Sequence, residues 1–163
     1  MLNNSVFLTT KQGSVVFGEI RKEHNIYPAN IYLALGNKKN GYVHIEERHG
    51  LQILNAGFSS VIEFVEYVAT NFTRIKEGQN KDGKHNGTYL LQVEDRYNNT
   101  LYIELCSSNG LNKDYWVINS GGVFKKTYGK KYKTVWSASE VQKQNRHLLG
   151  FCGATMKPKK KTP

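Results

Sequence analysis

The chain has 163 residues, of which 39% are hydrophobic and 12% aromatic, so it is long enough for one domain with its own core. Its formal net charge is +10. No stretch approaches the roughly 18 apolar residues that a membrane-spanning helix needs, and the first residues lack the pattern of a signal peptide, so we expect a soluble protein. Cys106 and Cys152 form no CxxC spacing, which indicates free thiols in a reducing compartment.

The positive charge is concentrated in the last third of the chain. Residues 1–109 hold equal numbers of basic and acidic side chains, whereas residues 110–163 hold twelve lysines and arginines against two acidic residues. The lysine-rich end, 151–163, is expected to be a disordered tail after a single domain over 1–150. A basic region that also carries many aromatic residues favours a polyanion, above all nucleic acid, as partner.

The first half of the chain predicts helices. Residues 17–25 have the pattern of a short amphipathic helix that ends before Pro28, and residues 30–36 predict a short strand. A helix is predicted from about 42 to Gly57, with one stripe facing the sheet. The stripe consists of Tyr42, Ile45, His49, Ile53 and Ala56. The clearest helix is 59–72, for which Ser59 is the expected N-cap.

The second half alternates with a period of two. Strands are predicted at 73–78, 88–95, 100–108, 114–121 and 133–137, separated by hairpin-like loops, with a last spacer at Gly121 and Gly122. The expected fold is therefore α+β, with N-terminal helices packed on a four- to five-stranded, mainly antiparallel sheet.

The decapeptide GYVHIEERHG, residues 41–50, contains two of the five histidines. His44 and His49 are five residues apart, so on a helix their side chains should point about 140° from each other, which is poor geometry for a shared metal ion. His44 instead shares a helix face with Arg48. His49 lies on the apolar stripe, where it is either a hydrogen-bonded core residue or a proton-transfer group.

The last predicted strands carry residues that could bind nucleic acid. Tyr115 and Trp116 lie on one strand, and the segment 123–140 interleaves lysines with aromatic residues, including Lys131, Lys133 and Trp136. Lysines can hold phosphate, aromatic rings can stack on bases, and the hydroxyls of Ser137 and Ser139 could hydrogen-bond a phosphoryl oxygen. An ordinary surface hairpin with Lys/Tyr pairs remains the alternative.

The order of the segments GYVHIEERHG, AGFSSVIEFVEYVATNFTRIKEG, TLYIEL, DYWVINS and KKYKTVWS resembles the phage-borne nuclease domains of the barnase/EndoU/colicin/RelE-like superfamily. The resemblance covers residues 15–140. Such domains occur at the C-terminus of phage head-morphogenesis proteins and in large polyvalent proteins of mobile elements. The resemblance implies an α+β fold and metal-independent, cofactor-free RNA cleavage, in which the ribose 2′-OH attacks phosphorus and leaves a 2′,3′-cyclic phosphate.

The resemblance also implies roles for particular residues. His49 would be the general base or acid, with His44 as the second candidate, and Arg48 would stabilise the phosphate. Lys133 and Ser137 would complete the catalytic site from the last strand. The expected substrate-binding residues are Tyr102, Tyr115, Lys131, Trp136 and Ser139.

The resemblance further favours a toxin-like endoribonuclease that acts on RNA, such as tRNA, in the cytoplasm of a target or host cell. An acidic immunity protein would be its expected protein partner. Two alternatives stay open: a nucleic-acid-binding module without catalysis, and an interaction domain of a phage or mobile-element protein whose basic face meets an acidic partner.

Overall fold

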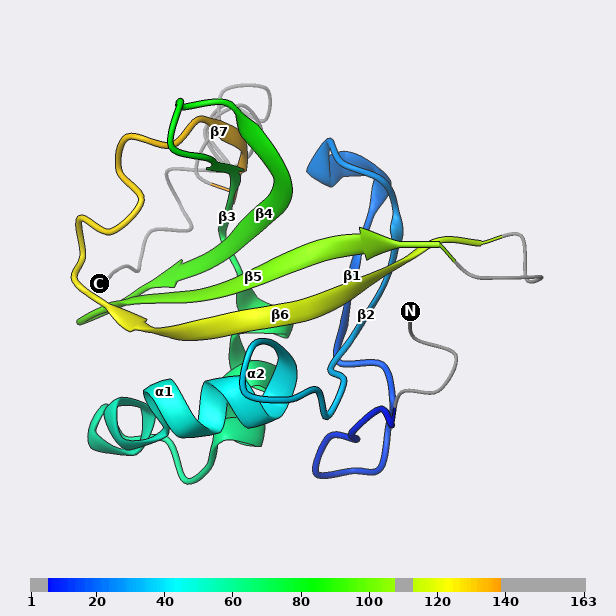
Figure 1. Cartoon of the computed structure of the whole chain (residues 1–163), viewed down its shortest axis with the longest axis vertical. Helices are drawn as coiled ribbons and strands as arrows, with labels where there is room; N and C mark the ends of the chain where they lie inside the picture. Colours follow the sequence, from blue (N-terminus) through cyan, green and yellow to red (C-terminus); the bar gives the residue numbers. More distant parts are fainter. Residues whose placement is uncertain (1–5, 108–112, 139–163) are drawn as a thin grey trace, which may run out of the picture.

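The computed structural model describes residues 6–107 and 113–138, which form two helices packed on a curled, half-barrel sheet of seven strands (Figure 1). The α+β class and the mostly antiparallel sheet are confirmed, but the sheet has more strands than the sequence predicts. In chain order the elements are β1 Gly18–Ile20, the 3-10 helix η1 Lys22–His24, β2 Ala29–Tyr32, α1 Gly41–Asn55, α2 Val61–Asn71, β3 Arg74–Gln79, β4 His85–Glu94, β5 Asn98–Cys106, β6 Tyr115–Phe124 and β7 Thr134–Ser137.

The prediction of a helix over 17–25 is wrong, because this segment forms β1 and η1. β1 pairs antiparallel with β2, which satisfies its backbone groups and places Phe17 and Ile20 in the core. Gly18 packs so closely on α2 that a Cβ there would lie 2.4 Å from the carbonyl oxygen of Ala69. Pairing and packing with distant elements therefore override the local helical pattern.

Both longer helices form where the sequence predicts them. α1 continues through Gly50 without a break, and it buries Ile45 and Ile53 on the predicted stripe. α2 begins one residue later than expected, because Ser60 rather than Ser59 is the N-cap: the Glu63 N–H donates to the Ser60 Oγ at 3.1 Å.

The seven strands have the order β1-β2-β6-β5-β4-β3-β7. The β2–β6 pair is parallel and the other pairs are antiparallel. Gly121 and Gly122, predicted as a spacer, lie inside β6 instead. At Gly121 a Cβ would meet the Leu101 Cδ2 at 2.7 Å, so the glycine allows β5 and β6 to approach without a clash.

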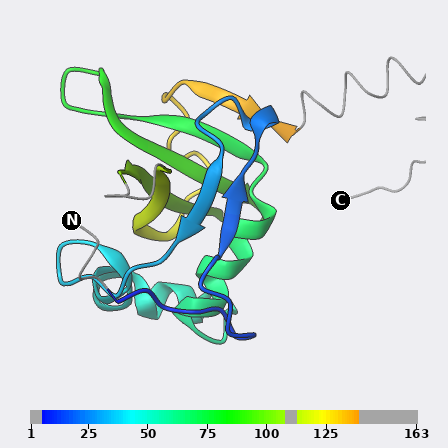
Figure 2. The same cartoon turned by 90° about the vertical axis from the view of Figure 1, so that its right-hand side faces the viewer.

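The two edges of the sheet approach each other through η1. The Asn25 side-chain amide donates to the Val135 carbonyl at 2.9 Å, and the His24 ring lies 4.5 Å from the Trp136 ring. Figure 2 shows the blue turn after β1 beside the orange strand β7. The curled sheet and α2 thus enclose one hydrophobic core, and α1 lies along β6 (Figure 1).

Residues 125–133, here called the lysine loop, cross the face of the sheet that is turned away from the core. Lys76 of β3 is only 7% exposed, and its Nζ donates to the carbonyl oxygens of Gly129 at 2.9 Å, Lys130 at 3.4 Å and Tyr132 at 3.4 Å. The Asn98 amide donates to the Tyr128 carbonyl at 2.9 Å. These bonds fix the path of the loop between β6 and β7.

Candidate functional site: a histidine pair on α1

His49 is held against β6 by the packing of α1. It lies on the same side of the helix as the buried residues Ile45 and Ile53, and the sequence expectation that it faces the sheet is confirmed. Its ring rests on Gly122, where a Cβ would lie 2.9 Å from the His49 Nδ1. His49 is half-buried rather than sealed in the core, so its imidazole remains accessible to a substrate.

Both histidines of α1 have one ring nitrogen fixed by a carbonyl oxygen. The His44 Nδ1–H donates to the Lys38 backbone carbonyl at 2.8 Å, and the His49 Nδ1–H donates to the Gln52 side-chain oxygen at 3.1 Å. A carbonyl oxygen can only accept, so each Nδ1 carries a proton. In the neutral ring the Nε2 atom is then free to take a proton, and in the charged ring it can give one.

The two rings lie together, with centroids 6.1 Å apart and planes at 71°. The helical angle of about 140° predicts two separate half-sites, and this expectation is not met. The long side chains bring the rings together although their Cα–Cβ bonds diverge around the helix. The two imidazoles therefore lie side by side, edge to face.

A row of aromatic side chains continues from His49 across the lysine loop. The Phe124 ring lies 5.7 Å from the His49 ring and stacks on Tyr128 at 4.0 Å with a 14° interplanar angle. The Tyr128 hydroxyl contacts the Tyr102 hydroxyl. Burial, with the Tyr128 hydroxyl as a second cause, raises the pKa of Tyr102 above its usual range. Tyr102 therefore holds the Tyr128 side chain in place through the contact between their hydroxyls.

Phe124 and Tyr128 were not among the predicted site residues. Their alternation with lysines in the sequence is a signal, but their proximity to His49 depends on β6 continuing past Gly121 and Gly122 along α1. Exposed cationic side chains occur on the same elements. Arg48 is exposed on α1, and Lys125 and Lys126 directly follow Phe124.

Several predicted site residues lie elsewhere. Lys133 precedes β7 and Ser137 ends it, and strands β5, β4 and β3 separate β7 from β6. The structure thus does not bring them to the histidine pair. Lys131 is exposed in the middle of the lysine loop. Trp136 packs against His24 and Phe72, away from His49.

Tyr115 lies far from the histidine pair along β6. Tyr115 begins β6 and Phe124 ends it, so they are roughly 30 Å apart at the usual rise of a strand. The Tyr115 ring contacts Phe7 and Tyr32 in an edge-on arrangement. Ser139, like Cys152 and the predicted tail, lies outside the described residues.

Among residues 6–107 and 113–138, no group of three His, Cys, Asp or Glu side chains is placed to hold a metal ion. In the same part of the chain, no helix is long and apolar enough to cross a membrane. No protein-family model matches the sequence, and a search of curated proteins gives no match.

Proposed function

We propose that the protein is a metal-independent endoribonuclease whose acid and base are His44 and His49. The observation that carries this proposal is the pair of imidazoles with centroids 6.1 Å apart, each with Nδ1 bonded to a carbonyl oxygen and with no hydrogen-bond partner for Nε2 among the described residues. Two imidazoles in opposite protonation states are the groups that RNA transphosphorylation needs near neutral pH. The resemblance of the sequence to RNA-cleaving domains supports the same assignment.

The reaction moves one proton at each imidazole. The neutral histidine takes the proton of the ribose 2′-OH at Nε2, and the 2′-oxygen forms a bond to the adjacent phosphorus. The bond from phosphorus to the 5′-oxygen then breaks, and the charged histidine gives its Nε2 proton to that oxygen. The products are a 2′,3′-cyclic phosphate and a 5′-hydroxyl. The attacking and leaving oxygens lie on opposite sides of phosphorus, and each would lie about 2.8 Å from the Nε2 of one of the two histidines.

The surroundings of the pair suit an RNA strand. The stacked rings of Phe124 and Tyr128 offer an aromatic platform beside His49 on which a base can stack. Arg48 and Lys125 are the nearest candidates in sequence for stabilising the charge that develops on the phosphoryl oxygens. The remaining lysines of the lysine loop would bind flanking phosphates.

Incubation of purified protein with RNA in EDTA tests the proposal. We expect fragments that end in 2′,3′-cyclic phosphate, and we expect His44→Gln and His49→Gln each to lower the rate by roughly 100-fold or more. His85→Gln is the matched control, because His85 is an exposed histidine whose Nδ1 also bonds a carbonyl oxygen, that of Gly78 at 3.2 Å. Intact RNA at neutral and mildly acidic pH would contradict the proposal.

The exposed lysines of the lysine loop also favour a second candidate, a nucleic-acid-binding module without catalysis. This candidate predicts RNA binding that weakens steeply with salt and no cleavage. If the enzyme acts as a toxin in the cytoplasm of a host or target cell, the same basic loop is where an acidic immunity protein would bind. Competition between such a protein and RNA would be visible as inhibition of cleavage.

A further inference from the structure

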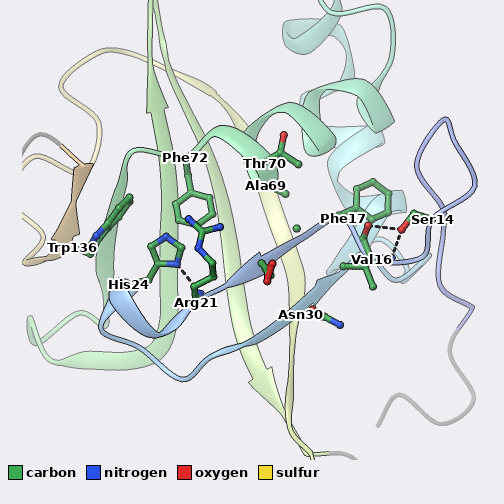
Figure 3. A pocket seen from close by; sticks show the side chains of 12 residues that line it. Ser14, Val16, Phe17, Arg21, His24, Asn30, Ala69, Thr70, Phe72 and Trp136 are labelled. Atoms are coloured by element: carbon green, nitrogen blue, oxygen red, sulfur yellow. Dashed lines mark hydrogen bonds between the residues drawn. The ribbon is translucent and has the colours of Figure 1, made fainter. Parts of the chain in front are cut away.

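A pocket of about 420 Å³ lies between β1, the C-terminal end of α2 and β7 (Figure 3). It shares no residue with the histidine pair and has the size of pockets that bind small molecules. Arg21, His24, Phe72 and Trp136 gather at one end of it, and Ser14, Val16 and Phe17 at the other (Figure 3). The first of these ends is rich in hydrogen-bond donors.

His24 presents an N–H to this end of the pocket. It is 2% exposed, and its Nδ1 accepts a hydrogen bond from the Arg21 backbone N–H at 2.8 Å, drawn as a dashed line in Figure 3. The proton of the neutral ring is therefore on Nε2, which has no acceptor among the described residues. Burial and the nearby Arg21 lower the pKa of His24, so the ring is neutral near pH 7.

Arg21 adds further donors, and Trp136 lies beside them. The Arg21 Nε–H donates to Glu23 at 2.7 Å, which leaves the two terminal amino groups of the guanidinium for a ligand. The Trp136 Nε1–H is buried and has no hydrogen-bond partner in the described part of the chain. This N–H is sealed from the open space of the pocket, so Trp136 contributes its ring, which lies 4.5 Å from the His24 ring, as a wall.

Oxygen acceptors lie at the mouth of the pocket instead. Glu19 and Asn30 are exposed, and they face each other across the β1–β2 pair. The hydroxyls of Ser14 and Thr70 already donate to the backbone carbonyls of Val16 and Glu66. A ligand that fits has an anionic group for the donor-rich end and hydroxyl groups for Glu19 and Asn30.

We propose that this pocket binds a phosphate monoester, with the phosphoryl group at Arg21 and His24, the Trp136 ring beside it, and the hydroxyls of the ester at Glu19 and Asn30. Sugar phosphates and nucleotides share this chemistry. A planar guanidinium matches phosphate oxygens with paired donors, and the His24 Nε2–H supplies a neutral donor beside it. The binding is independent of RNA cleavage at His44 and His49.

The two tryptophans allow a direct test by NMR of their indole N–H groups. We expect inorganic phosphate, ribose 5-phosphate and a nucleoside 5′-monophosphate to shift the Trp136 signal in a saturable way, with ribose 5-phosphate tighter than inorganic phosphate. The Trp116 signal is the internal control, because its Nε1–H already donates to the Tyr27 carbonyl at 2.8 Å. Loss of one signal in Trp136→Phe assigns the two.

Variants at the two ends of the pocket sharpen the test. Arg21→Gln should weaken the binding of all three phosphates at least tenfold. Arg96→Gln, at an exposed arginine over the Tyr97 ring, should leave their binding unchanged. Glu19→Gln should weaken the binding of ribose 5-phosphate but not that of inorganic phosphate. A Trp136 signal that no phosphate shifts, equal affinities in the two arginine variants, or acetate binding as tightly as phosphate would overturn the proposal.

Discussion

The ring of His49 rests on a residue without a side chain, and this contact positions the imidazole. A Cβ at Gly122 would lie 2.9 Å from Nδ1 and 3.1 Å from Cγ of His49. The ring is the end of a flexible side chain, so it can move away without disturbing the backbone. Gly122→Ala should therefore displace the imidazole while the fold persists.

We expect Gly122→Ala to lower the rate of RNA cleavage by up to about 100-fold, since a misplacement of about 1 Å can cost that much. The melting temperature should change little. Ser120→Ala, on the same strand beside Tyr102, is the control and should leave both quantities unchanged. Full activity in Gly122→Ala would show that the contact does not position His49.

His24 should make the stability of the protein depend on pH. Burial and the positive charge of Arg21 lower its pKa in the folded state below the ordinary value of 6.5, although Glu23 and Glu19 oppose this shift. Between the two pKa values the unfolded chain binds the proton and the folded chain does not. The contribution of His24 is thus complete above pH 6.5 and is lost as the pH falls toward the folded-state pKa.

Urea unfolding at a series of pH values measures this effect. In His24→Asn the new side-chain oxygen can still accept the Arg21 N–H. The unfolding free energy of the native protein should exceed that of this variant by less and less as the pH falls below 6.5. A difference that stays constant over this range would contradict the assignment of His24 as a neutral, buried group.

At the scale of elements, Lys76 connects β3 to the lysine loop. Its ammonium donates to three loop carbonyls, of Gly129, Lys130 and Tyr132. Burial lowers the pKa of Lys76, but the three acceptors compensate for part of the lost hydration. The loop carries Tyr128, so its order also matters to the aromatic platform beside His49.

Lys76→Met keeps most of the side-chain volume and removes the three hydrogen bonds. We expect trypsin to cut the lysine loop faster in this variant, because a loosened loop reaches the protease more often. Mass spectrometry of the fragments identifies cuts within 125–133. In Lys84→Met, at an exposed lysine of the β3–β4 turn, trypsin should cut within 125–133 at the native rate. Equal rates of these cuts in the two variants would show that Lys76 does not hold the loop.

At the scale of the whole molecule, periodicity explains what the sequence could predict. The stripes of α1 and α2 and the alternation of β3 to β7 are local patterns, and the elements form there. β1 has three residues, too few to show a period, and its pairing with β2 and the link from Asn25 to Val135 join distant segments. Such contacts leave no local trace in one sequence.

The candidate site, too, could be predicted from the sequence only in part. The orientation of His49 follows from its place on the stripe of α1. Its neighbours Phe124 and Tyr128 depend on the length of β6 and on the packing of α1 along it, and the separation of Lys133 and Ser137 from the pair depends on the strand order. Both are properties of the tertiary fold.

The central claim is that His44 and His49 divide acid and base between them. Cleavage of an RNA dinucleotide whose leaving 5′-oxygen is replaced by sulfur tests it most directly, because a thiolate leaves without a proton. We predict that one of His44→Gln and His49→Gln, the variant without the acid, regains nearly the native rate on this substrate, and that the other stays slow. Rescue of both variants, or of neither, would contradict the account.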